Sequence, residues 1–148
     1  MEKFTHMKIQ KLLLIVIFLI MVTPISAQTG VNSTATLDIE VQGIEKGGIL
    51  NLEISSTKEA FESDEDDAGV AARIQEKVSG GSYQHSFKIP PGTYAVKLHI
   101  DENENGKLDT NFLGIPKEQY GISNNGRFLN FKVASFIIDT YKKIQIEL

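Results

Sequence analysis

The sequence contains no cysteine. The chain can therefore form no disulfide, no zinc–thiolate site and no thiol-based active site, and it has no cysteine that could carry a lipid anchor. Its fold has to be stabilised by a hydrophobic core alone. A content of 41% hydrophobic residues in 148 residues is enough for one ordinary domain core.

The GxSxG motif for nucleophilic catalysis is also missing, so the sequence offers no serine nucleophile of that kind. Only His85 and His99 follow the N-terminal leader, and strand alternation points His85 inward and His99 outward. We expect no shared site from them, because a single histidine in a strand is more often structural than catalytic.

Long hydrophobic runs are absent except near the start of the chain. Leu12–Val22 is an unbroken apolar run of 11 residues, preceded by lysines and followed by the small residues Ser26 and Ala27. This run is shorter than the ~20 residues that span a bilayer as a helix. The pattern predicts a secretory signal peptide at 1–27 that is cleaved after Ala27. We therefore expect an exported protein, periplasmic or extracellular, with no stable membrane span.

Positive charge is scarce in the expected mature chain. Residues 1–27 carry three lysines and one glutamate, so their removal takes the formal net charge from −4 to −6. An acidic domain is poorly suited to nucleic acid or to anionic membrane surfaces and better suited to cations. The acidic run Glu62–Asp67 has no ligand spacing and no glycine, so we interpret it as a solvated loop.

Alternating hydrophobic residues dominate the rest of the chain, after a small, polar stretch at 28–35 that we interpret as a flexible leader. Apolar residues at every second position predict strands with one buried face. The clearest alternation covers residues 36–42, 50–55, 71–78, 83–89, 94–100 and 144–148. We interpret Phe128–Asp139 as further β material, and Lys58–Phe61 as a helical turn that places Phe61 at the edge of the core.

Short turns rich in glycine and proline separate these segments. Gly47 and Gly48 predict a hairpin between the first two strands, because glycine accepts the positive φ of tight hairpins. About seven short strands and no long helix predict an all-β fold for residues 36–148, a single antiparallel β-sandwich of immunoglobulin-like or transthyretin-like type. The expected core contains Leu37, Ile39, Leu52, Ile54, Phe87, Val96 and Leu98.

Oxygen-bearing side chains concentrate just after the strand at 94–100. Asp101, Asn103 and Asn105 occupy alternate positions, and Gly106 and then Asp109 follow them. A hard cation such as calcium takes about six to eight oxygen ligands from a tightly curled loop with a glycine at its bend. The spacing predicts a calcium site formed by Asp101, Asn103, Asn105, the carbonyl of Lys107, and Asp109.

The same loop has a simpler interpretation as a turn, because Asp, Asn and Gly are the commonest turn residues. The twelfth position of the loop, where an EF-hand has a bidentate glutamate, is Phe112. Folding back of Glu118 or of the Asn124 amide would replace this missing ligand. We expect the remainder of the long loop to pack on itself around an internal core of Ile115, Tyr120 and Ile122.

The segment Pro90–Asn125 contains three motifs in a fixed order, PPGTYA, DENENGKLD and GIPKEQYGISNN. Together they resemble the signature of the DUF2141 family of uncharacterised proteins. The resemblance implies an exported or envelope-associated bacterial β-domain of unknown function. The chain departs from the family pattern at Ile100, where relatives often have histidine, and His99 lies one residue earlier.

Two classes of function follow from these observations. The first is a non-catalytic binding or structural module of the cell envelope, with calcium as its cofactor and an unknown envelope or extracellular ligand as its partner. The alternative is a carboxylate-dependent hydrolase acting on envelope glycans, which needs two carboxylates about 5 to 9.5 Å apart in an open cleft. The lack of a nucleophile–base pair favours the first class.

Overall fold

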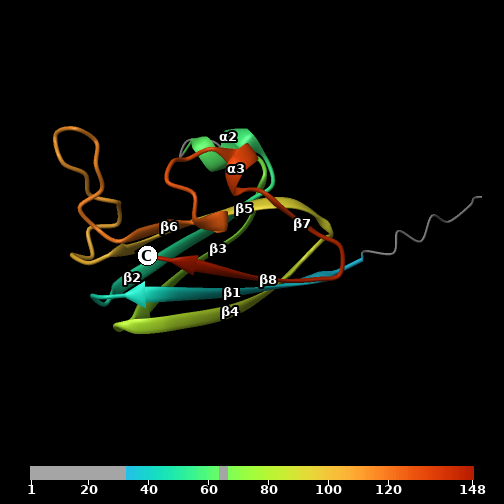
Figure 1. Ribbon diagram of the computed structural model, residues 1–148, viewed down its shortest axis with the longest axis horizontal. Coiled ribbons are helices and arrows are strands. Elements are labelled where there is room, and N and C mark those ends of the chain that lie inside the picture. The colour runs from blue at the N-terminus through green and yellow to red at the C-terminus, as the bar shows by residue number, and fades with distance from the viewer. Residues whose placement is uncertain (1–32, 64–66) are drawn as a thin grey trace, which may run out of the picture. The chain divides into compact units, whose positions relative to one another are not determined.

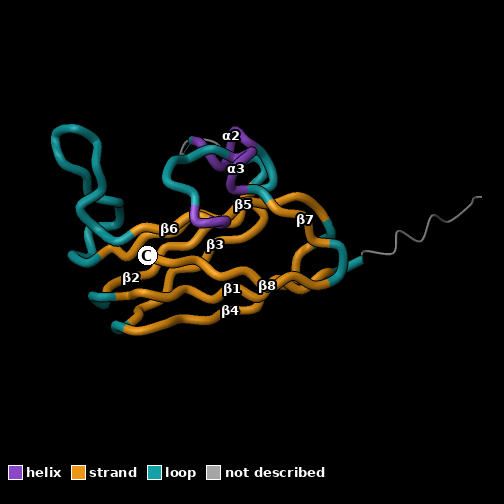
Figure 2. The backbone as a smooth tube through the Cα atoms, in the orientation of Figure 1, coloured by secondary structure: helices purple, strands orange, loops and turns teal. Residues whose placement is uncertain are grey.

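The computed structural model describes residues 33–63 and 67–148. The expected signal peptide at 1–27, most of the leader at 28–35 and part of the acidic run Glu62–Asp67 lie outside the described residues. Strands dominate the described part, with two sheets and a few short helical segments (Figures 1 and 2), which confirms the prediction of an all-β fold. No helix within these residues has both the length and the apolar character needed to cross a membrane.

The larger sheet has five strands in the order β3-β2-β5-β6, and β7 pairs with the start of β5. Its strands are β2 (Gly48–Ser55), β3 (Val70–Val78), β5 (Gly92–Asp101), β6 (Tyr120–Ile122) and β7 (Phe136–Ile138). The smaller sheet has the order β4-β1-β8. Its strands are β1 (Ala35–Ile44), β4 (Gly81–Ile89) and β8 (Tyr141–Glu147). The described residues thus form eight strands, one more than the sequence suggested.

Alternation along the strands turns one face of each sheet toward a shared core. All seven residues predicted for this core are less than 9% exposed, and strands of both sheets contribute to it. They are Leu37, Ile39, Leu52, Ile54, Phe87, Val96 and Leu98. The inward and outward positions predicted from the sequence are therefore confirmed.

Truncating Leu98 tests this core. Leu98 lies in the middle of β5 and is 4% exposed, so Leu98→Ala is expected to lower the free energy of unfolding by about 2–5 kcal/mol. Leu113 is 67% exposed, and Leu113→Ala is expected to change it by less than about 0.5 kcal/mol. Equilibrium unfolding in urea measures both variants. Equal stabilities for the two variants would contradict the assigned core.

The first two strands do not form the predicted hairpin. β1 pairs with β4 and β8, whereas β2 pairs with β3 and β5. The turn at Gly47 and Gly48 therefore carries the chain from one sheet to the other, and the turn between β3 and β4 does the same. A short turn between two alternating strands fits both arrangements, because either one buries the same faces.

The glycines of this turn also have a different role from the one predicted. Neither Gly47 nor Gly48 has a positive φ. A Cβ at Gly48 would lie 2.3 Å from the carbonyl oxygen of Asp101, and one at Gly47 would lie 2.6 Å from that of Val78. Close approach of neighbouring backbones therefore requires glycine here, and Gly48 supports the strand end from which the candidate cation loop begins.

The smaller sheet is not purely antiparallel. β1 and β8 run parallel, from Thr36 opposite Tyr141 to Gln42 opposite Glu147. Parallel neighbours need a long connection between them, and here all the other strands lie in that connection. The prediction of a wholly antiparallel arrangement was wrong for this pair, because alternation reveals the buried face of a strand and not its direction.

Two short helices, α2 (Lys58–Glu62) and α3 (Phe131–Ala134), cover the outer face of the larger sheet beside β5 (Figure 1). Phe61 of α2 is 0% exposed and meets Phe131 of α3 edge-on, with ring centroids 6.0 Å apart. The predicted helical turn at Lys58–Phe61 is confirmed. The segment Phe128–Asp139, expected to be β material, contains α3 and only the short strand β7.

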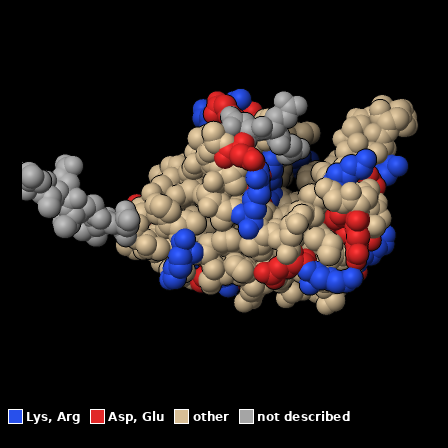
Figure 3. All heavy atoms as spheres, turned by 180° about the vertical axis from the view of Figure 1, so that it is seen from behind, with Lys and Arg blue, Asp and Glu red and all other residues tan. Residues whose placement is uncertain are grey.

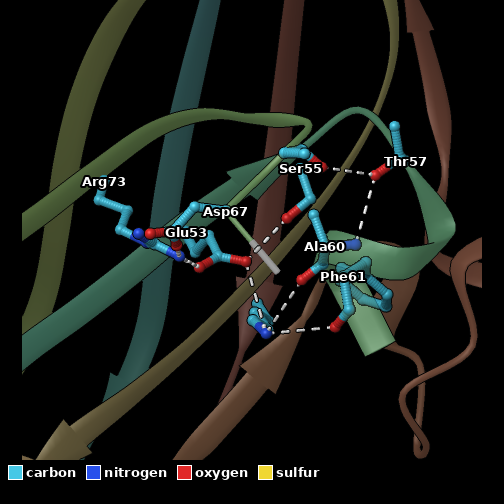
Figure 4. A network of polar contacts seen from close by, with 9 residues as sticks. Glu53, Ser55, Thr57, Ala60, Phe61, Asp67 and Arg73 are labelled. Atoms are coloured by element: carbon cyan, nitrogen blue, oxygen red, sulfur yellow. Dashed lines mark hydrogen bonds and ion pairs between the residues drawn. The ribbon is translucent and has the colours of Figure 1, made fainter. Parts of the chain in front are cut away.

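A polar network holds α2 against the sheet (Figure 4). The amino group of Lys97 on β5 donates to the carbonyl oxygens of Ala60, at 3.5 Å, and Phe61, at 3.2 Å. The same amino group lies 3.4 Å from one carboxylate oxygen of Glu53, whose other oxygen is 2.8 Å from the guanidinium of Arg73. Lys97 thus satisfies carbonyl groups that a five-residue helix leaves without intrahelical donors.

Candidate functional site

The candidate cation loop, residues 101–109, begins at the end of β5 (Figures 1 and 2). Asp101 is the last residue of that strand and is 2% exposed. Its carboxylate accepts hydrogen bonds from the backbone N–H groups of Asn105, at 3.1 Å, and Gly106, at 2.7 Å. Gly106 has a φ of 84°, which L-residues rarely adopt. The loop therefore curls tightly around the Asp101 carboxylate, as the spacing predicted.

The side chains of Asn103 and Asn105 both turn toward Asp109. One carboxylate oxygen of Asp109 accepts from the amide nitrogens of Asn103, at 2.7 Å, and Asn105, at 3.1 Å. The hydrogen bond from Asn103, followed by that from Asn105, holds the pKa of the Asp109 carboxyl below its usual value. Lys107 takes part through its backbone, because its N–H donates to the side-chain oxygen of Asn105 while its side chain is exposed.

Glu118 lies just before β6, near the end of the connection between β5 and β6, and folds back onto this loop. It is 7% exposed, and its two carboxylate oxygens accept from the backbone N–H groups of Glu102, at 3.0 Å, and Asp109, at 2.9 Å. Its carboxylate therefore joins the two ends of the candidate cation loop. Asn124, the other residue expected to fold back, instead donates to carbonyl groups at the end of α3, including that of Ala134 at 3.2 Å.

Gln119 attaches the connection to the turn between β1 and β2. Its side-chain oxygen accepts from the backbone N–H groups of Glu45, at 3.2 Å, and Lys46, at 3.0 Å. Its side-chain nitrogen donates to the carbonyl of Gly43 at 2.9 Å. Sequence reasoning missed this residue, and the only available signal was its position next to Glu118 within the motif KEQYG.

The outer end of the connection does not pack as predicted. Of the three residues expected to form its internal core, only Ile122 is buried, while Ile115 is 54% and Tyr120 is 38% exposed. Phe112, at the twelfth position, is 93% exposed. The side-chain oxygen of Asn111, which accepts from the N–H groups of Leu113 and Ile115, organises this outer end without a hydrophobic centre.

The donors around the candidate cation loop are mixed in type. The described residues contain no group of three or more His, Cys, Asp or Glu side chains placed to hold a metal by themselves. The available donors are the carboxylates of Asp101, Asp109 and Glu118 and the amide oxygens of Asn103 and Asn105. All are hard oxygens, which calcium prefers. Each carboxylate has about four lone-pair positions, so the N–H groups that it accepts leave room for a cation. In chemical type, these oxygens are therefore the donors that calcium takes.

A second polar cluster lines a shallow depression of about 180 Å³ on the smaller sheet and contains the carboxylates of Asp38 and Glu40. The hydroxyl of Ser86 donates to Asp38 at 2.5 Å and lowers the pKa of that carboxyl. The ammonium of Lys143, 2.9 Å from Glu40, lowers the pKa of Glu40. A glycosidase needs one carboxyl with a raised pKa, so this pair does not support the hydrolase alternative.

The two histidines lie in different sheets, His85 in the smaller and His99 in the larger. His85 on β4 packs against Phe87, with ring centroids 4.6 Å apart, and its Nδ1 lies 3.0 Å from the hydroxyl of Tyr83. His99 on β5 contacts the side chain of Asn51 at 3.3 Å. They form no common catalytic or metal site.

A search of curated proteins finds no match to this chain, and neither does a search of solved structures. The model of one protein family does match, over residues 39–146, and that family is described as an uncharacterized protein conserved in bacteria (DUF2141). The matched segment covers most of the chain and includes the candidate cation loop, Glu118 and Gln119. The chain therefore belongs to the DUF2141 family.

Proposed function

We propose that the protein is an exported, non-catalytic binding or structural module whose candidate cation loop holds one calcium ion. Residues 1–27 act as its signal peptide, and the mature domain works in the periplasm or outside the cell on an envelope or extracellular ligand. The two sheets form a single sandwich of immunoglobulin-like or transthyretin-like type. This architecture presents the loop from the end of a rigid strand.

The position of the Glu118 carboxylate carries this proposal. The spacing of residues 101–109 lacks the bidentate glutamate of an EF-hand, since its twelfth residue is Phe112. Glu118, buried and bonded to the backbone at both ends of the loop, supports a role as the substitute acid. The calcium ligands are then Asp101, Asn103, Asn105, the carbonyl of Lys107, Asp109 and Glu118.

Charge explains why a cation would stabilise this arrangement. The carboxylates of Asp101, Asp109 and Glu118 belong to one loop and repel each other, and the repulsion is stronger where they are partly buried than in water. Calcium would offset the repulsion and the loss of chain entropy in ordering the loop. Because several ligands are neutral amides or carbonyls, we expect a dissociation constant of about 10⁻⁴ to 10⁻³ M, as in extracellular calcium modules.

Calcium is therefore expected to raise the thermal stability of the purified protein. A ligand that binds only the folded state adds about 2.7 kcal/mol at a concentration of 100 times its dissociation constant. Thermal melts in calcium and in chelator measure the shift, and calorimetric titration measures the binding directly. Magnesium serves as the control and should act weakly, because it requires a near-ideal octahedron and loses water reluctantly. Identical melts and no heat of binding at millimolar calcium would refute the proposal.

A further inference from the structure

The connection between β5 and β6 ends in an exposed apolar tip. Phe112, Leu113 and Ile115 are 93%, 67% and 54% exposed, and they lie within four consecutive residues. Figure 1 shows this segment projecting beyond the ends of β5 and β6, and Figure 3 shows the same projection from behind. Residues 110–116 carry no charged side chain. The molecule thus holds a convex hydrophobic surface away from its body.

Four of the five backbone N–H groups of residues 111–115 are hydrogen-bonded within the tip. The side-chain oxygen of Asn111 accepts from the N–H groups of Leu113, at 2.9 Å, and Ile115, at 3.0 Å. The carbonyl of Asn111 accepts from Gly114 at 2.9 Å, and its N–H donates to the carbonyl of Ile115 at 2.8 Å. The next residue, Pro116, has no N–H group. These bonds lower the free-energy cost of moving the tip from water into lipid, because a backbone polar group without a hydrogen-bond partner is unfavourable in an apolar medium.

Two exposed lysines lie at the base of the tip, beside acidic residues of the candidate cation loop. Lys107 and Lys117 are both exposed, and the backbone N–H of Lys117 donates to the carbonyl of Asp109 at 2.8 Å, which holds it beside the candidate cation loop. Figure 3 shows Lys or Arg side chains directly below the uncharged projection, with Asp or Glu side chains next to them. Lysines in this position place their ammonium groups at the level of lipid phosphates when apolar neighbours enter the bilayer.

We infer that this tip inserts into the interfacial region of a phospholipid bilayer and docks the domain on a membrane surface. A zwitterionic surface fits best, since the chain is acidic overall and apolar burial rather than net charge drives the contact. Because a single turn inserts only into the interface of the bilayer, the domain attaches to the membrane peripherally and reversibly. This inference goes beyond calcium binding and does not require it.

A single tryptophan tests the insertion directly, because the chain has no tryptophan of its own. Phe112→Trp places the reporter at the tip, and Phe128→Trp, at a residue that is 80% exposed in another loop, is the matched control. Phosphatidylcholine vesicles are expected to shift the emission of Phe112→Trp to the blue and to protect it from a soluble quencher. The emission of Phe128→Trp should stay unchanged. No shift at position 112, or an equal shift in both variants, would overturn the inference.

Flotation with the same vesicles measures the affinity. Phe112→Ser is expected to weaken partitioning of the protein by about tenfold or more, from the loss of one large buried side chain. Phe128→Ser should bind as the parent does. Equal binding by both serine variants would contradict the inference. A blue shift of Phe112→Trp that grows with protein concentration in the absence of vesicles would also contradict it, because that result would assign the tip to self-association.

Discussion

Replacing Asp101 with alanine is expected to abolish the stabilisation by calcium while leaving the two sheets folded. Asp101 is the first ligand of the proposed site and also the residue around which the loop curls, since its carboxylate accepts the N–H groups of Asn105 and Gly106. Both donors belong to exposed residues, so water is able to replace the lost acceptor. The effect on the unfolding of the chelated protein should therefore be small, whereas the calcium-dependent shift should disappear.

Thermal melts of the parent and of Asp101→Ala, each in calcium and in chelator, separate these two effects. Lys107→Ala is the matched control within the same loop, because only its backbone is a proposed ligand and its side chain is exposed. It should respond to calcium as the parent does. A full calcium shift in Asp101→Ala would show that residues 101–109 form a turn and not an ion site.

Phe61→Ala is expected to cause the largest loss of stability, about 3–5 kcal/mol in the free energy of unfolding. Phe61 is 0% exposed and joins α2 to α3 through its edge-on contact with Phe131. It also packs in one cluster with Ala95 of β5 and Ile122 of β6. Both helices are too short to persist without such packing, so a cavity here loosens the whole cover of the outer sheet face.

Phe112→Ala provides the control for this substitution, because it removes the same atoms from a residue that is 93% exposed. It should change the stability by less than about 0.5 kcal/mol. Equilibrium unfolding followed by far-ultraviolet circular dichroism measures both variants. A loss below about 1 kcal/mol at Phe61 would mean that the two helices are not needed to stabilise the sheets.

The buried faces of the strands were predictable from the sequence, whereas the sheet to which each strand belongs was not. A period of two identifies the side of a strand that is buried, whichever neighbour it pairs with. It placed Leu37, Val96 and Leu98 correctly. It says nothing about whether a short turn stays in one sheet, which is why the turn at Gly47 and Gly48 was interpreted as a hairpin.

The candidate cation loop was predictable where its contacts are local. The curl around Asp101 and the bend at Gly106 follow from spacing within six residues. The sequence offered Glu118 and Asn124 as substitutes for the missing twelfth ligand. In the fold only Glu118 contacts the loop, through Asp109, whereas Asn124 contacts Ala134. Gln119 was not predictable, because its partner Glu45 is 74 residues away in the sequence and a side-chain amide carries no signal of such a contact.

The exposed tip was misread for a different reason. Apolar residues in a long loop usually indicate that the loop packs on itself, and that expectation was applied to Ile115 and Tyr120. In the structure the nearby backbone is satisfied by the side chain of Asn111, so the turn is stable without a hydrophobic centre. Composition alone does not distinguish an apolar residue that packs within a loop from one that the loop holds in solvent.

The parallel pairing of β1 with β8 also constrains the kinetics of folding. β1 starts at Ala35, but its partner Tyr141–Glu147 leaves the ribosome only after all the other strands, so the smaller sheet cannot close on a nascent chain. Contacts between residues so distant in sequence raise the contact order, and folding dominated by such contacts takes about milliseconds to seconds. A nascent chain that has not reached Tyr141 therefore leaves one edge of β1 without its partner strand.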